Sequence, residues 1–396
     1  MLRRSDQVRA VPLPCPLPYP FGMTATARTS PIDRLPPALP LWCLLLPVLA
    51  LVLLLALQVS GAAAWWSVLL AALGLIAAVL SAVHHAEVVA HRVGEPFGTL
   101  VLALAVTVIE VALIVSLMLA GGAAASALAR DTVFAAVMIV CNGVVGLCLL
   151  VGGIRHGVLA FRVEGTSPSL AVLAALCTLT LVLPVFTTST PGPTFSGPQL
   201  AFAGIVSLAL YGVFVFVQTV RHRDYFLPAD ADDLADASAH AEPPTATVAW
   251  IALALLMLCL VSVVGLAKTL APSLEAGVTA IGAPQALVGV LVALLVLLPE
   301  TWAAVRAAAH NRLQTSLNLA IGSALASIGL TIPAVAVLSL VYPHPLVLGL
   351  APSAIVMLVL TFLVGTLTLG RGRATVLQGA VHLVLFAVFL FLAIFP

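Results

Sequence analysis

Two glutamates stand inside long apolar segments of the chain. Glu110 lies in LVLALAVTVIEVALIVSLMLA and Glu300 lies in ALVGVLVALLVLLPETWAAV. A carboxylate at the centre of a membrane-spanning helix costs about 2.5 kcal/mol or more, so it usually faces a protein-lined or hydrated interior. Such residues are typical of proteins that move ions or protons. Two of them in comparable settings predict a transporter with paired repeats.

The composition fixes the class of protein that must position these carboxylates. The chain has 396 residues, of which 62% are hydrophobic and 8% are charged, whereas a soluble domain is about one quarter charged. We therefore expect an all-α integral membrane protein, and the net charge of +1 gives no basic face for nucleic acid. Since a spanning helix needs about 20 apolar residues, hydropathy predicts about eleven spans, at 41–59, 64–84, 97–121, 132–153, 168–188, 198–220, 248–270, 284–308, 315–341, 345–369 and 374–395.

The segments around the two glutamates are similar to one another. One begins at Glu87 and the other at Glu275, and each has a glycine seven residues later, Gly94 or Gly282. Each then continues as an apolar run that contains the second glutamate. Counted along the whole chain, Glu110 falls in the third span and Glu300 falls in the eighth. Because an offset of five spans is odd, equivalent helices run in opposite directions, which predicts inverted repeats with an ion site near the midplane.

The loop charges predict the orientation of the chain. If the N-terminus is cytoplasmic, fourteen of the sixteen lysines and arginines fall on the inward side, and only Arg130 and Lys268 fall on the outward side. This asymmetry is what the positive-inside rule requires. We expect a cytoplasmic N-terminus, an outer C-terminus and a bacterial inner membrane as the location.

Changes in composition divide the chain into five parts. We expect a disordered cytoplasmic arm over 1–40, an extra transmembrane helix over 41–59 and a first repeat over 64–220. An acidic cytoplasmic linker over 221–247 and a second repeat over 248–395 follow. The linker is either a simple solvated connection or a segment that attracts cations or regulates the protein.

Three segments give the chain a resemblance to a known family. They are GEPFGTLVLALAVTVIEVALI, ARDTVFAAVMIVCNGVVGLCLLVGGIRH and LLPETWAAVRAAAHNRLQTSLNLAIGSALASIGLTIP. Together they resemble the calcium/proton exchanger branch of the cation/calcium antiporter superfamily. The resemblance implies the sodium/calcium exchanger fold, with two inverted five-helix repeats after an extra N-terminal helix. It also implies that Glu110 and Glu300 present their carboxylates to the transported cation. The family's usual glycine and asparagine before each glutamate are absent from this chain.

The predicted site has the chemistry of a calcium ligand set. Calcium takes six to eight oxygen ligands, and the two glutamates would supply the charged ones. Thr107, one helical turn before Glu110, can add a hydroxyl, and neutral oxygens of the adjoining helices can complete the set; these are on Asn142, Asn318 and Ser323. Two facing carboxylates repel each other without a cation, so the same pair can hold either a metal ion or protons. This competition predicts exchange of one divalent cation for at least two protons.

A second polar cluster lies at the predicted cytoplasmic end of the second span. His84 and His85 with Glu87 form either a solvated interfacial surface or a proton path or pH sensor, because histidine titrates near neutrality.

Several functions compete within this interpretation. The favoured one is an antiporter that exchanges Ca²⁺ for H⁺, with Na⁺ or K⁺ as further candidate cations. The alternative is a monovalent Na⁺ or K⁺/H⁺ antiporter with little Ca²⁺ transport, and a cation channel is less favoured. We expect neither an enzyme nor a cofactor, because the spans carry no HExxH or paired aspartates and the chain has no GxxxxGK[ST] loop. The expected partners are inorganic cations, protons and membrane lipid.

Overall fold

The computed structural model describes residues 39–60, 64–94, 97–121, 125–226, 243–342 and 346–396. The expected disordered arm and most of the acidic linker therefore lie outside the described residues.

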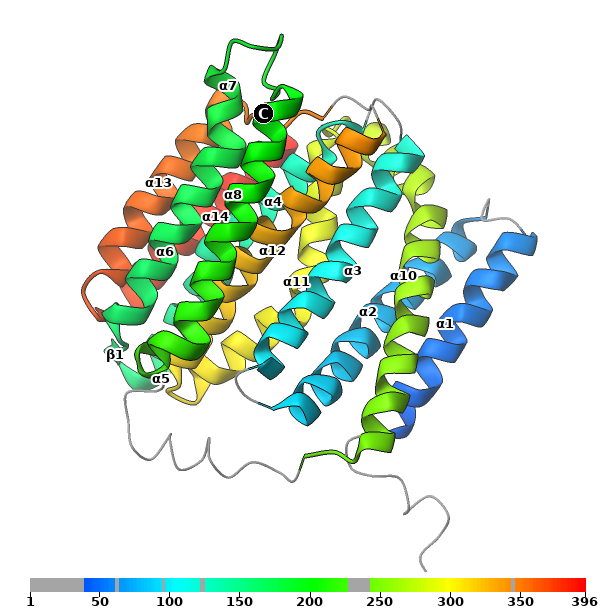
Figure 1. Cartoon of the computed structure of the whole chain (residues 1–396), viewed down its shortest axis with the longest axis horizontal. Helices are drawn as coiled ribbons and strands as arrows, with labels where there is room; N and C mark the ends of the chain where they lie inside the picture. The colour runs from blue at the N-terminus through cyan, green and yellow to red at the C-terminus, as the bar shows by residue number, and fades with distance from the viewer. Residues whose placement is uncertain (1–38, 61–63, 95–96, 122–124, 227–242, 343–345) are drawn as a thin grey trace, which may run out of the picture. The chain divides into compact units, whose positions relative to one another are not determined.

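Long apolar helices make up almost all of the described chain (Figure 1). Ten helical segments are long and apolar enough to cross a bilayer, and α3 is a further apolar helix. The predicted all-α fold with about eleven spans is thus confirmed. The spans are α1 (Leu41–Ser60), α2 (Trp65–Val93), α3 (Phe97–Gly121), α4–η3–α5 (Leu128–Met138, Ile139–Val144, Val145–His156), α6–η4–α7 (Val163–Cys177, Thr178–Val182, Leu183–Phe186), α8–η5 (Gly197–Phe216, Val217–Arg221), α10 (Ala246–Ala280), α11 (Ala286–Ala309), α12 (Leu313–Val341), α13 (Pro352–Leu369) and α14 (Val376–Ile394).

Three helix ends differ clearly from the predicted span limits. Helix α2 continues past residue 84 to Val93, and α10 continues past residue 270 to Ala280. Hydropathy falls at polar residues, but the histidines, glutamate and alanines there still form helix. Helix α13 starts late, at Pro352, because proline is favoured in the first turn of a helix.

The two repeats are related by inversion, as their packing shows. The first helices of the repeats, α2 and α10, pack against each other, and α3 packs against α12 as α11 packs against α4. Likewise α8 packs against α12 as α14 packs against α5. The glycines matched in the sequence also agree, since Gly94 and Gly282 have φ values of 75° and 70° at the ends of α2 and α10. Positive φ favours glycine, so both copies place a glycine at the backbone turn that follows this helix.

Contacts between loops show which loops lie together at each of the two membrane faces. On the first face, strand β1 (Leu159–Ala160) pairs antiparallel with strand β2 (Arg373–Ala374). We call this the strand face. On the opposite face, the amide of Val347 donates to the carbonyl of Ser126 at 3.1 Å, and loops predicted to lie outside come together.

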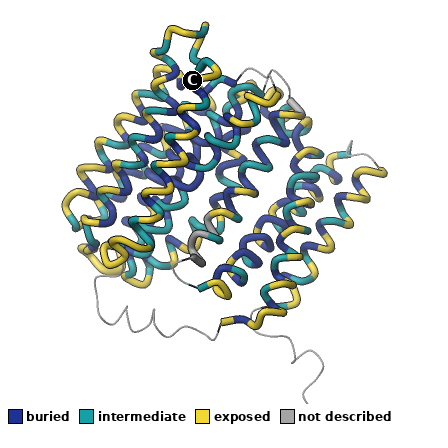
Figure 2. Tube along the Cα trace, in the orientation of Figure 1, coloured by how far each residue is buried: buried dark blue, intermediate teal, exposed yellow. Residues whose placement is uncertain are grey.

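The central elements are the most deeply buried ones (Figure 2). The span from Leu128 to His156 is almost wholly enclosed by other helices, and most of α12 is enclosed as well. Helix α14 approaches α5 closely because both carry glycine at the contact. A Cβ atom added to Gly379 would lie 2.7 Å from the amide nitrogen of Leu150 and 3.0 Å from the carbonyl oxygen of Gly146. Small residues that allow this approach are typical of helix contacts in membranes.

Candidate ion-binding site

Glu110 lies in the middle of α3 and faces α12. Its side chain is 5% exposed, and the Ser327 hydroxyl donates a 2.5 Å hydrogen bond to Oε1 of the carboxylate. Ser327 is itself 3% exposed. Because α3 and α12 belong to different repeats, this bond joins the two halves of the protein at a carboxylate.

Glu300 lies on α11 and is the counterpart of Glu110 in the second repeat. Its Oε2 atom is buried and has no hydrogen-bond partner among the described residues. Helix α11 packs against α3, which carries Glu110, and against α2, which carries Glu87. Pro299 immediately precedes Glu300 within the helix. Proline has no backbone N–H, so the carbonyl of Leu295 loses its usual intrahelical donor beside this site.

Two of the predicted neutral ligands lie on helix faces that adjoin the carboxylates. Thr107 is buried and lies one turn before Glu110 on α3. Ser323 lies one turn before Ser327 on α12 and remains partly exposed in the middle of the helix. Residues four apart share a helix face. Ser323 therefore lies beside the bond between the hydroxyl of Ser327 and Glu110.

Asn142 belongs to a different polar cluster. It is fully buried in the π-helical turn η3, where its Nδ2 donates to Thr361 Oγ1 at 2.9 Å. Its Oδ1 lies 3.3 Å from His382 Nδ1, and His382 Nε2 lies 3.1 Å from Thr368 Oγ1. We call Asn142, Thr361, Thr368 and His382 the Asn142 cluster. The amide of Asn142 is thus bonded to α13 and α14 and contacts neither glutamate by a hydrogen bond.

Asn318 is also engaged away from the carboxylates. Its Oδ1 accepts from Gln314 Nε2 at 2.9 Å, and its Nδ2 donates to the carbonyl of Phe226 at 2.5 Å. It precedes Ser327 by nine residues, which is about 14 Å along a helix. In this conformation Asn318 fastens the end of α12 to the η6 turn (Arg223–Phe226) at the strand face.

His84, His85 and Glu87 have different surroundings in the structure. His85 is fully buried, with Nε2 2.9 Å from the carbonyl of Cys43, and the ring of His84 lies 5.0 Å from that of Trp42. Both histidines therefore contact α1. Glu87 is exposed and lies on the part of α2 that follows the two histidines.

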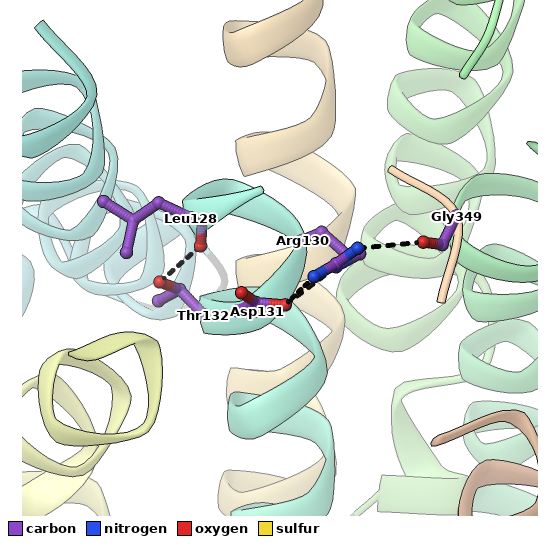
Figure 3. A network of polar contacts seen from close by, with 5 residues as sticks. All are labelled: Leu128, Arg130, Asp131, Thr132 and Gly349. Carbon is purple, nitrogen blue, oxygen red and sulfur yellow. Dashed lines mark hydrogen bonds and ion pairs between the residues drawn. The ribbon is translucent and has the colours of Figure 1, made fainter. Parts of the chain in front are cut away.

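An ion pair lies near the start of α4, at the face opposite the strand face (Figure 3). Arg130 contacts Asp131 Oδ1 at 2.7 Å and donates to the carbonyl of Gly349 at 3.1 Å. Helix α11 passes close by, since a Cβ added to Gly289 would lie 2.9 Å from the backbone of Asp131 and Thr132. These contacts join α4 of the first repeat to α11 and to the segment before α13 in the second.

Two residues of these sites were not identified from the sequence. Ser327 follows Ser323 by four residues in GSALAS, and that spacing places both hydroxyls on one helix face. His382 is a single histidine in the last apolar span, where an ionisable residue usually marks an interior polar contact.

Comparison with known proteins agrees with this architecture. Residues 63–220 and 251–395 each match the sodium/calcium exchanger protein family. The chain belongs to this family. It is therefore a multi-pass membrane transporter and not an enzyme.

Two relatives and two solved structures are similar to the chain. An ionic transporter by name, y4hA of Sinorhizobium fredii, is 55% identical over 322 residues, which is 81% of this chain and 87% of that protein. The sodium-potassium/proton antiporter ChaA of Escherichia coli is 38% identical over 323 residues, with the same coverage of 81% and 87%.

The solved structures show the fold. Native YfkE has a TM-score of 0.68 at 17% identity and covers 89% of this chain and 100% of its own. The H⁺/Ca²⁺ exchanger CAX has a TM-score of 0.64 at 16% identity and covers 88% of this chain and 87% of its own. The exchanger fold expected from the sequence is thus confirmed.

Proposed function

We propose that the protein is a secondary antiporter that exchanges a cation, Ca²⁺ in the first place, for protons at Glu110 and Glu300. One observation carries the proposal. The two carboxylates come from opposite repeats and lie within apolar helices, α3 and α11, that pack against each other. A buried pair of this kind needs a neutralising partner, and both cations and protons can supply it.

Transport of the cation and of protons is coupled because the two carboxylates bind one or the other, not both at once. Two carboxylates cancel the charge of one divalent cation and can contribute up to four of its six to eight oxygens. Two protons neutralise the same pair, but a protonated carboxyl is a poor cation ligand. The proposed stoichiometry is therefore one divalent cation against at least two protons.

We assign the neutral ligands to the hydroxyls that lie beside the carboxylates. Ser327 already contacts Glu110, and its oxygen can turn its lone pairs toward a bound cation. Thr107 and Ser323 lie one turn away on the same two helices. The amides of Asn142 and Asn318 have other partners, so their proposed contribution requires that they leave those partners.

The strand face is proposed to be cytoplasmic. It carries arginines of three different loops, including Arg155, Arg312 and Arg373, whereas the opposite face carries Arg130. The positive-inside rule then orients the chain with its C-terminus outside. The proton gradient of a bacterial inner membrane would drive the cation out as protons enter.

A monovalent antiporter is the second candidate. The Escherichia coli relative is named as a sodium-potassium/proton antiporter, and a single charge can be held by the same carboxylates. Assays with Na⁺ and K⁺ beside Ca²⁺ separate the two candidates. Conductance that ignores the proton gradient would instead indicate a channel.

The test is transport in everted vesicles with a fluorescent pH indicator. Addition of the cation should release protons from the vesicle interior, and Glu110→Gln or Glu300→Gln should each abolish the release. Glu164→Gln is the control, because Glu164 is an exposed glutamate at the start of α6. Exchange that persists in both site variants would disprove the proposal.

A further inference from the structure

The hydroxyl groups of Ser327 and Thr331 on α12 do not bond to the carbonyl four residues earlier. Many described serines and threonines within helices donate to the carbonyl four residues earlier, which satisfies the hydroxyl inside its own helix. This holds for Thr132, Thr166, Ser169, Thr180, Thr219, Ser262, Thr269, Thr279, Thr301 and Thr366. On α12, Ser327 donates instead to Glu110, and Thr331 donates to no described group.

Ser316 and Thr331 are buried residues of α12 whose hydroxyls have no partner among the described residues, and of the two Thr331 lies one helical turn from Ser327. Thr331 is fully buried, and its Oγ1 has no partner among the described residues. The carbonyl of Ser327, four residues earlier, is the ordinary acceptor, yet the hydroxyl does not use it. Buried polar groups are nearly always paired with protein or with ordered water, so Thr331 points to a water molecule.

The spacing of the two hydroxyls fits one bridging water. Ser327 and Thr331 are four residues apart and share one face of α12, where side chains are separated by about 5–6 Å. Two hydrogen bonds of about 2.8 Å each span that distance. One water bonded to both hydroxyls would satisfy Thr331 and would connect it to the bond between Ser327 and Glu110.

We propose that Thr331 holds a buried water that relays protons to and from Glu110 through the hydroxyl of Ser327. The inference rests on the proposed exchange function and adds to it a route for protons that lies apart from Glu300. In the loading direction, the water gives a proton to the Ser327 oxygen as Ser327 gives its own proton to Glu110. The water then takes a proton from a hydronium ion of the solvent on its other side. One proton is transferred, and both the serine and the water return to their original composition.

The relay is interrupted in this conformation. The next residues on the same face of α12 toward the opposite membrane face are apolar and buried, namely Val335 and Ala336. They offer no hydrogen bond to the water. In this proposal, solvent protons reach the water only when that end of α12 admits solvent past these two side chains.

The test compares two kinds of exchange in proteoliposomes that hold Thr331→Val. Valine has nearly the same shape as threonine but lacks the hydroxyl. Exchange of calcium for protons, followed with radioactive calcium, should slow by about tenfold or more, since a positioned proton donor is lost. Exchange of calcium for calcium needs no proton transfer, so its rate in the same vesicles should stay within about twofold of the unchanged protein.

Two further variants complete the experiment. Thr331→Ser keeps the hydroxyl and should restore calcium/proton exchange. Thr180→Val removes an equally buried hydroxyl that is bonded within its own helix, and it should change neither rate. The relay is disproved if Thr331→Val slows both kinds of exchange equally or slows neither. Failure of the unchanged protein to couple calcium or sodium to protons would instead disprove the proposed function.

Discussion

The contact between α5 and α14 allows one substitution to be worked out in detail. In Gly379→Ala, the added Cβ would lie 2.7 Å from the Leu150 nitrogen and 3.0 Å from the Gly146 oxygen. These are backbone atoms, so no side chain can rotate away, and the two helices must separate. Overpacking of this kind costs about 1–3 kcal/mol. Alanine also stabilises a helix by about 0.5–1 kcal/mol relative to glycine.

Gly212→Ala isolates the packing cost. Gly212 lies within α8, and a Cβ added there would meet no atom within 4 Å. Both variants gain the helix propensity of alanine, so the gain cancels in their comparison. We expect Gly379→Ala to be less stable than Gly212→Ala by about 1–3 kcal/mol in denaturant unfolding of the purified protein in detergent. Equal stability of the two variants would refute the close packing of α5 on α14.

Three more predictions follow from the described contacts. His382→Leu removes the ring that contacts the Asn142 amide and should destabilise the protein by about 1–3 kcal/mol in the same unfolding assay. Adding Asn142→Leu should cost less than the sum of the single changes, by up to about 1.7 kcal/mol, and strict additivity would argue against their contact. Arg130→Ala should increase thiol labelling of cysteines placed in the segment 346–351, because its hydrogen bond to that segment is lost; unchanged labelling would contradict this. Cysteines at Ala160 and Arg373, which face each other in the paired strands, should form a disulfide under mild oxidation, whereas a shifted register would leave them reduced.

The sequence was sufficient for the fold because few physical constraints decide it. Apolar length sets the number of spans, and loop charge sets their alternation. The matched positions Gly94 and Gly282 then indicated the repeat, since both glycines follow their helix with a positive φ. Helix ends were less predictable. The end of α2 at Val93 depends on helix propensity and on contacts with α1, which hydropathy does not measure.

The candidate site was only partly predictable. Hydropathy makes an isolated glutamate conspicuous, so Glu110 and Glu300 could be found from the sequence. A neutral side chain carries no such signal, and its role depends on the direction in which its helix faces. Asn142 and Ser327 both lie near the middle of central spans, yet one is bonded to α13 and α14 and the other to Glu110. The sequence does not fix that rotation.

The unequal bonding of the two glutamates has a kinetic consequence. The repeats are related by inversion, but Glu110 accepts a hydrogen bond from Ser327 while Oε2 of Glu300 has no described partner. A carrier with identical halves would turn over at the same speed whichever way it was inserted in the bilayer. In this protein the two insertions should reach the same final gradients, as thermodynamics demands, but at different speeds.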